Sequence, residues 1–283
     1  MGQGGAGAQH FGGLTMIRPS ETPPGWDTHV HVFEAEAPVQ PGHYRPVHRP
    51  LADIEALAQA HGVGHLVLVQ PSVYGTDNRV LTRSLAQAAG RHRGVVVVPP
   101  SVTEKELQHM HAVGVRGVRF NLVSPVGNAA GDLPGLAPRL KALGWHVQWY
   151  AQPQDLPTIE GLHRQTGLPC VLDHLAGLNP GVPDDAPAWE ALARLAGQGA
   201  WIKLSGWYRL QAQAPYEALV PHIRRVAALF AQRMVWGSDW PHTFFPPGEV
   251  PPYTATQHPV AAALGEDALA RIRLAGGTLY ATP

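Results

Sequence analysis

The chain has 283 residues, of which 45% are hydrophobic and 15% are charged, and its 21 basic and 21 acidic residues cancel. This length suits one α/β barrel of about 250 residues or two smaller domains. The zero net charge gives no general attraction to nucleic acid or to an anionic membrane surface. No apolar run approaches the ~20 residues of a membrane-spanning helix, so we expect neither partner.

Residues 1–20 are rich in glycine and lack the basic start and apolar run of a signal peptide. We interpret them as a flexible tail that precedes a single domain spanning residues 21–283. The single cysteine, Cys170, allows no internal disulfide, which is compatible with a reducing compartment. These features favour a cytoplasmic protein.

Eight short apolar segments, rich in β-branched residues, alternate with segments of helical periodicity. The predicted strands are 26–33, 65–70, 94–99, 115–121, 145–151, 168–174, 201–206 and 234–239. Their almost continuous hydrophobicity is typical of parallel strands that are buried on both faces. Eight strand–helix units in this order predict a (β/α)8 TIM barrel, with an open doubly wound sheet as the alternative.

The predicted helices begin at 50–53 and near 76–78, and then cover 103–113, 135–143, 154–166, 187–198, 215–231 and 257–274. Five helical segments end in glycine, the residue that most readily adopts the left-handed conformation after a helix. These predicted stops are Gly62, Gly90, Gly114, Gly144 and Gly167.

Polar residues gather where predicted strands end, which is where the reactive groups of such barrels lie. His29 and His31 lie two residues apart on the first strand, so both point to the same side. The sixth strand ends at His174 and the eighth at Asp239. Three imidazoles and one carboxylate are therefore expected at one mouth of the barrel, where they can polarise a carbonyl or hold a metal ion.

Three motifs resemble the amidohydrolase-related branch of the amidohydrolase superfamily: DTHVH at 27–31, VLDH at 171–174 and WGSDWP at 236–241. Three more are similar to the lactonases of that branch, which include sugar-acid and pyrone-dicarboxylate lactonases. They are QPSVYGTDN at 70–78, RGVRFN at 116–121 and KLSGWYR at 203–209. The resemblance covers about residues 25–245, with every motif in the expected order.

This resemblance implies that Asp239 takes a proton from water, while His29, His31 and His174 polarise the carbonyl or position that water. It also implies substrate contacts from carboxylate-binding arginines and from hydroxyl-bearing residues. The residues at these positions are Arg119, Arg209, Ser72, Thr76, Tyr44 and Tyr150. Because a guanidinium group matches a carboxylate, the implied substrate is a small carboxylated lactone.

The sequence departs from metal-dependent relatives in the fifth strand, which ends in Gln148 or Tyr150 rather than in histidine, and no lysine ends the fourth. These departures favour a metal-free site. If zinc were bound, its ligands would be the four residues His29, His31, His174 and Asp239. Residues 121–127 also lack the basic residue of the dicarboxylate lactonases, so a second substrate carboxylate lacks that partner.

Two other functions remain open at this point. One is a zinc-dependent amidohydrolase or decarboxylase, and the other is a non-catalytic binding barrel, which we expect to have lost a central residue. Structural roles are open as well, because Arg119 or Arg209 could pair with Asp173 or Asp27. The hydroxyl groups at positions 72 and 76 could cap the second helix.

Overall fold

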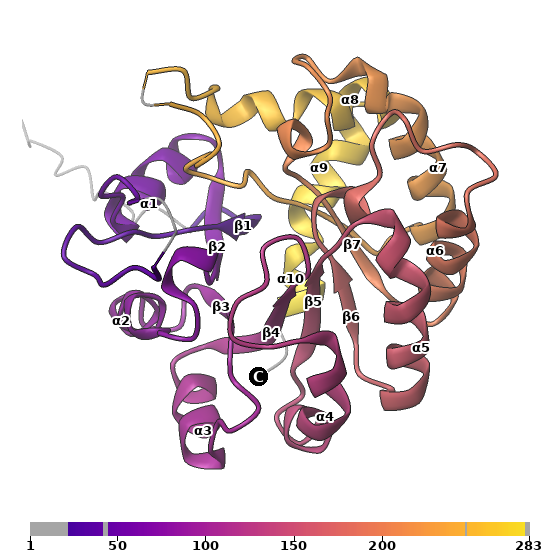
Figure 1. Cartoon of the computed structure of the whole chain (residues 1–283). Coiled ribbons are helices and arrows are strands. Elements are labelled where there is room, and N and C mark those ends of the chain that lie inside the picture. The colour runs from indigo at the N-terminus through magenta and orange to yellow at the C-terminus, as the bar shows by residue number, and fades with distance from the viewer. Residues whose placement is uncertain (1–21, 42–44, 247, 281–283) are drawn as a thin grey trace, which may run out of the picture.

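Eight parallel strands follow one another around the structure in the order of the sequence (Figure 1). The computed structural model describes residues 22–280 except for 42–44 and 247, so the predicted tail at 1–20 lies outside the described residues. Two backbone hydrogen bonds join the ends of the first and last strands: His31 N to Trp240 O at 2.8 Å and Asp239 N to His29 O at 2.9 Å. The predicted (β/α)8 barrel is confirmed.

All eight predicted strands are present, most of them shorter than predicted because their ends bend into loops. They are β1 (Gly25–Val30), β2 (Val63–Val69), β3 (Arg93–Val96), β4 (Val115–Asn121), β5 (His146–Tyr150), β6 (Cys170–Leu172), β7 (Trp201–Leu204) and β8 (Met234–Trp236).

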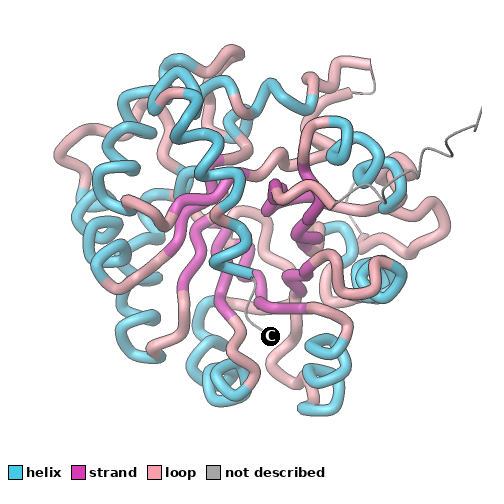
Figure 2. Tube along the Cα trace, turned by 180° about the vertical axis from the view of Figure 1, so that it is seen from behind, coloured by secondary structure: helices cyan, strands magenta, loops and turns pink. Residues whose placement is uncertain are grey.

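Helices surround these strands, as the view from behind also shows (Figure 2). They are α1 (Leu51–Ala60), α2 (Arg79–Gln87), α3 (Glu104–Ala112), α4 (Leu133–Ala142), α5 (Leu156–Thr166), α6 (Pro187–Gly197), α7 (Val220–Phe230), α8 (His258–Leu264), α9 (Glu266–Leu274) and α10 (Gly276–Tyr280). No helix in the described part of the chain has the length and apolar character that a membrane crossing needs.

The prediction of one helix over 257–274 is wrong. Gly265 separates α8 from α9 with φ 86° and ψ 162°, a backbone conformation that residues with a side chain rarely adopt. The five predicted glycine stops do follow helical segments with positive φ, for example 63° at Gly167. Helical spacing alone therefore located the segment but not the break inside it.

The floor of the barrel is closed by α10. The ring of Tyr280 stacks on Trp26 with 6.0 Å between centroids and meets the ring of His146 at 5.3 Å. Gly276 allows this close approach, because a Cβ atom there would lie 2.5 Å from Cβ of Trp26. The amino ends of the strands are thereby sealed, and the carboxyl ends form the open mouth.

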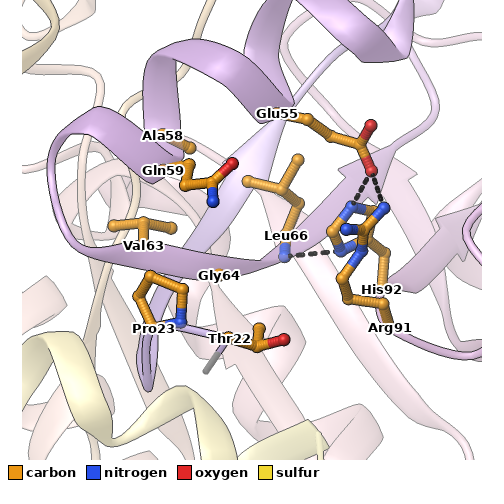
Figure 3. Close-up of a pocket in the computed structure, with 10 residues that line it drawn as sticks. All are labelled: Thr22, Pro23, Glu55, Ala58, Gln59, Val63, Gly64, Leu66, Arg91 and His92. Atoms are coloured by element: carbon orange, nitrogen blue, oxygen red, sulfur yellow. Dashed lines mark hydrogen bonds and ion pairs between the residues drawn. The ribbon is translucent and has the colours of Figure 1, made fainter. Parts of the chain in front are cut away.

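A small cavity of about 140 Å³ lies at the amino ends of β2 and β3 (Figure 3). Glu55 of α1 accepts a hydrogen bond from Arg91 and lies 2.9 Å from His92 Nε2. The other ring nitrogen of His92 accepts from the amide of Leu66 at 3.2 Å. Because both nitrogens of His92 contact neighbouring elements, we interpret this cluster as a structural tie between α1, β2 and the start of β3.

Replacement of Tyr280 by alanine is expected to lower the free energy of unfolding by about 3–5 kcal/mol. The ring is fully buried and its hydroxyl has no partner among the described residues, so the loss comes from the cavity. Urea denaturation followed by circular dichroism measures it. The control Leu274→Ala, at a side chain that is 50% exposed, should change the free energy by under about 0.5 kcal/mol. Equal effects of the two variants would contradict a sealing role for Tyr280.

Candidate active site

The structure brings the four predicted catalytic residues together at the carboxyl ends of β1, β6 and β8. Asp239 Oδ1 lies 3.6 Å from His29 Nε2 and 3.4 Å from His31 Nε2. The ring centroid of His174 lies 4.7 Å from that of His29. All four residues are buried, so solvent competes little with contacts between them.

Backbone strain is concentrated at the same place. His174 has φ 47° and Asp239 has φ 61°, values in the left-handed region that few residues other than glycine adopt. Such a conformation costs about 1–3 kcal/mol and persists where neighbouring contacts enforce it. One such contact is the bond from Trp240 N to Ser238 Oγ at 3.0 Å. The strain therefore coincides with the positions for which chemistry is predicted.

The two oxygens of Asp239 have different surroundings. Oδ2 accepts hydrogen bonds from the Tyr208 hydroxyl at 2.5 Å and from Arg209 Nε at 2.6 Å. Oδ1 has no hydrogen-bond partner among the described residues. Although burial acts in the opposite direction, the charge of Arg209 holds the pKa of Asp239 well below its ordinary value. Asp239 is thus ionised at neutral pH, and Oδ1 is its oxygen without a hydrogen-bond donor among the described residues.

Asp173 is the second buried carboxylate of the site. Its Oδ2 accepts from Arg119 Nε at 3.2 Å and from Gln148 Nε2 at 3.0 Å. Its Oδ1 lies 3.2 Å from His29 Nδ1 and 3.5 Å from Lys203 Nζ. Against the effect of burial, the nearby positive charges hold the pKa of Asp173 well below its ordinary value. Asp173 therefore anchors the ring of His29 from below.

Lys203 was not predicted as a site residue from the sequence. Its ammonium group is fully buried and donates to Thr28 O and to Gln148 Oε1, both at 2.7 Å. Burial lowers the pKa of Lys203 to about 8, which leaves the group mostly protonated at pH 7. Polar residues at alternating positions 203 and 205 of a buried strand were the available signal, because both then face the barrel interior. Ser205 Oγ lies 2.9 Å from His174 Nδ1.

The two predicted substrate arginines reach the site, but each contacts a carboxylate of the protein. Arg119 pairs with Asp173, the structural alternative that the sequence left open, and Arg209 pairs with Asp239 rather than with Asp27. The guanidinium carbon of Arg119 lies 5.4 Å from the ring centre of Tyr150. That ring in turn meets His174 edge-on, with 4.9 Å between ring centroids. Binding of a substrate carboxylate by these residues stays a prediction.

The predicted hydroxyl residues are less closely connected with the centre. Ser72 begins a short 3-10 turn, and Thr76 lines a separate cleft of about 800 Å³ beside α2 and α3. Within the described ranges neither hydroxyl contacts a catalytic residue, and neither caps α2, because Asn78 is the residue that precedes this helix. Tyr44 lies outside the described residues. Substrate contacts of these three residues remain predictions.

The donor atoms at the centre fit a single metal ion. One ligand atom each from His29, His174 and Asp239 lie within 4.8 Å of one another, and His29 Nε2 and Asp239 Oδ1 lack partners among the described residues. Three such donors with an open position suit zinc. Gln148 of β5 is hydrogen-bonded to Asp173 and to Lys203, so β5 contributes no ligand for a second, bridged ion.

Residues 26–273 match the amidohydrolase family. The chain belongs to this family. A 2-pyrone-4,6-dicarboxylate hydrolase from Comamonas testosteroni is 34% identical over 232 residues, which cover 76% of each chain. A 4-sulfomuconolactone hydrolase from Rhizobium radiobacter is 31% identical over 236 residues, or 80% of this amidohydrolase and 79% of the relative.

Solved structures of amidohydrolases show the same barrel. A crystal structure from Pseudomonas putida, assigned to 2-pyrone-4,6-dicarboxylic acid hydrolase, is 31% identical and superposes with a TM-score of 0.81. It covers 91% of this chain and 97% of its own. A second, from Acinetobacter baumannii and with citric acid bound, has 25% identity and a TM-score of 0.81, and covers 92% and 100% of the two chains.

Acid is expected to destabilise this amidohydrolase through its buried histidines. Burial lowers the pKa of His174 and of His242 to about 4 and that of His146 to about 3. In the unfolded chain a histidine takes up its proton near pH 6.5. Between that pH and 4 the unfolded state therefore binds more protons than the folded state, so the free energy of unfolding falls as the pH falls.

The expected loss is about 2 kcal/mol per histidine at pH 5. Asp27 acts in the opposite direction over part of this range, because burial raises its pKa to about 6. Urea denaturation at pH 7, 6 and 5 measures the sum. A free energy of unfolding that stays constant or rises between pH 7 and 5 would show that these imidazoles are not held neutral in the folded state.

Proposed function

We propose that the protein hydrolyses a small carboxylated lactone, with Asp239 Oδ1 accepting the proton of the attacking water. The observation that carries the proposal is the position of this unpartnered carboxylate oxygen, 3.4 to 3.6 Å from two imidazole nitrogens. Relatives that open lactone rings support the substrate class. The three cations Arg119, Arg209 and Lys203 outnumber the two carboxylates that they contact, which suits an anionic substrate.

His31 is suited to orient the water. Its Nδ1 lies 2.7 Å from the carbonyl oxygen of Val69, which requires a hydrogen on Nδ1, and in the neutral ring Nε2 is then an acceptor. Nε2 of His31 and Oδ1 of Asp239 are then two acceptors 3.4 Å apart. A water molecule can donate one hydrogen to each, which directs an oxygen lone pair at the lactone carbonyl.

His174 is suited to polarise the carbonyl. If the Ser205 hydroxyl donates to His174 Nδ1, the imidazole proton is on Nε2 and can be donated to the carbonyl oxygen. His29 Nε2 lies beside this position without a partner among the described residues. Water adds to the carbonyl carbon, its proton passes to Asp239, and the ring C–O bond breaks. The ring oxygen leaves with that proton, and the new carboxylic acid releases its own proton to solvent, so the product carries one new carboxylate.

The pairing of Arg209 with Asp239 gives the substrate carboxylate a second role. A carboxylate stabilised by an arginine is a weak base. A substrate carboxylate that binds Arg209 competes with Asp239 for the guanidinium group, and the weaker pairing raises the pKa of Asp239. The general base then becomes effective when the anionic substrate is present.

Asp239→Asn is expected to lower kcat by about 10²–10⁴-fold, the usual contribution of a general base. Asparagine tolerates the positive φ at this position, so the fold should be retained. Acid release at constant pH, followed with a panel of carboxylated lactones, measures turnover and also separates an enzyme from a binding protein. Asp184→Asn, whose side chain is 97% exposed, is the matched control and should leave kcat unchanged. Full turnover by Asp239→Asn would sink the mechanism.

A zinc-dependent hydrolase or decarboxylase is the second candidate, favoured by the three convergent donors of His29, His174 and Asp239. Zinc held there would act as a Lewis acid and would lower the pKa of bound water. We favour the metal-free reaction, because the cations of Lys203 and Arg209 already lie against ligands of this set. Lactone hydrolysis is therefore expected to survive chelation that removes all metal detectable by mass spectrometry. Loss of activity with the chelator, and its recovery on adding Zn²⁺, would favour the metal-dependent candidate instead.

A further inference from the structure

Two consecutive residues, Tyr208 and Arg209, hold the same oxygen of Asp239. They belong to the short 3-10 turn Trp207–Arg209, which follows β7. The Tyr208 hydroxyl donates to Asp239 Oδ2 at 2.5 Å, and Arg209 Nε donates to the same oxygen at 2.6 Å. This oxygen thus has one neutral and one charged donor, and the two need not act at the same stage of the reaction.

The turn is held in place by contacts that do not involve Asp239. Trp207 is fully buried and donates from Nε1 to Thr256 O at 2.7 Å, which connects the turn with the loop after β8. Gly206 precedes the turn with φ 61°, and a Cβ atom there would lie 2.3 Å from His174 Nδ1. A side chain is therefore excluded, and the chain packs directly on the His174 ring. The backbone that carries both donors can stay where it is when one of them changes partner.

The two donors differ in their access to a ligand. Tyr208 is 8% exposed, and its ring packs against Phe244 and Phe245 with 5.8 and 4.9 Å between centroids. The side chain of Arg209 is 19% exposed, and its guanidinium group has further N–H donors. It also carries the charge, whereas a phenol is neutral at pH 7. A substrate carboxylate therefore attracts Arg209 more strongly than Tyr208.

If Arg209 were the sole donor to Oδ2, its move to the substrate would leave the general base without a fixed orientation. The Cβ–Cγ torsion of an aspartate has only a broad preference, so a carboxylate without donors can turn. Such a turn would move Oδ1 away from His29 Nε2 and His31 Nε2, which lie 3.6 and 3.4 Å from it. A buried carboxylate oxygen without a donor is also unfavourable in itself. One lasting donor on Oδ2 prevents both effects.

We propose that Tyr208 is a positioning residue, which keeps Asp239 Oδ1 directed at the attacking water while Arg209 turns to the substrate carboxylate. The inference rests on the proposed function, in which that carboxylate competes with Asp239 for Arg209. Once Arg209 has moved, the base is stronger because a positive charge has left it. It is still oriented, because the hydroxyl remains on Oδ2.

Two lactones that differ in charge test the role of the hydroxyl. One is 2-pyrone-4,6-dicarboxylate and the other is its uncharged diamide. In Tyr208→Phe, kcat/KM for the dicarboxylate should fall about 30–100-fold, because a buried carboxylate oxygen is left without a donor. For the diamide the decrease should be about 5-fold or less, the effect of one ordinary hydrogen bond, because Arg209 stays on Asp239. Phenylalanine keeps the ring contacts of Tyr208, so the fold should be retained, which circular dichroism checks.

Calorimetry with an unreactive acid gives a second readout that needs no turnover. Benzene-1,3-dicarboxylate should bind to Tyr208→Phe at least about 10-fold more weakly than to the wild type. Tyr253→Phe is the matched control, because the Tyr253 hydroxyl donates to another buried carboxylate, that of Asp27, at 2.8 Å. This control should not distinguish the dicarboxylate from the diamide. Arg209→Gln should bind the acid more weakly as well, since it lacks the donor that changes partner.

An equal decrease of kcat/KM for both lactones in Tyr208→Phe, or an unchanged affinity for the acid, would overturn the inference. A hydroxyl with a purely structural role would affect charged and uncharged ligands alike. Failure of the proposed function gives a different result. A wild type that hydrolyses neither lactone, together with weaker binding of the acid by Tyr208→Phe, would refute the function and leave the exchange of Arg209 supported.

Discussion

The buried carboxylate of Asp173 is the group on which the arrangement of the catalytic centre depends. It stands after β6 and contacts side chains from β1, β4, β5 and β7, namely His29, Arg119, Gln148 and Lys203. A fully buried charge is tolerated only with such partners, because removing one from a buried pair costs about 3–5 kcal/mol. The contacts therefore tie five strands together and fix His29 at its distance from Asp239.

The two acids of the centre have different roles: Asp173 holds other side chains in place, and Asp239 is the proposed general base. Oδ1 of each acid lacks a hydrogen-bond partner among the described residues, but that of Asp173 lies 3.5 Å from the Lys203 ammonium group, whereas that of Asp239 faces the imidazoles of His29 and His31. A carboxylate that binds donors through one oxygen is held in a fixed orientation, while its other oxygen can still accept a hydrogen bond. The positive φ of Asp239 contributes, since it turns the side chain from the end of β8 toward the imidazoles.

The sequence predicted the barrel and the meeting of His29, His31, His174 and Asp239, because strand order and alternation fix where strand ends lie. It did not predict the role of Lys203, whose burial is stabilised by a carbonyl and an amide from two other strands. It also did not show that Arg209 rests on Asp239, since the partner of a long side chain depends on packing far from it in sequence. The break at Gly265 was missed because the apolar spacing continues on both sides.

The sealed floor of the barrel has a consequence for how the enzyme turns over. Tyr280 and Trp26 close the end opposite the catalytic groups, so reactant and product both pass through the mouth at the carboxyl ends of the strands. The product therefore leaves past the same cationic side chains that the reactant passed on entering. The ring-opened acid carries one more negative charge than the lactone, so these side chains attract the product more strongly than the reactant.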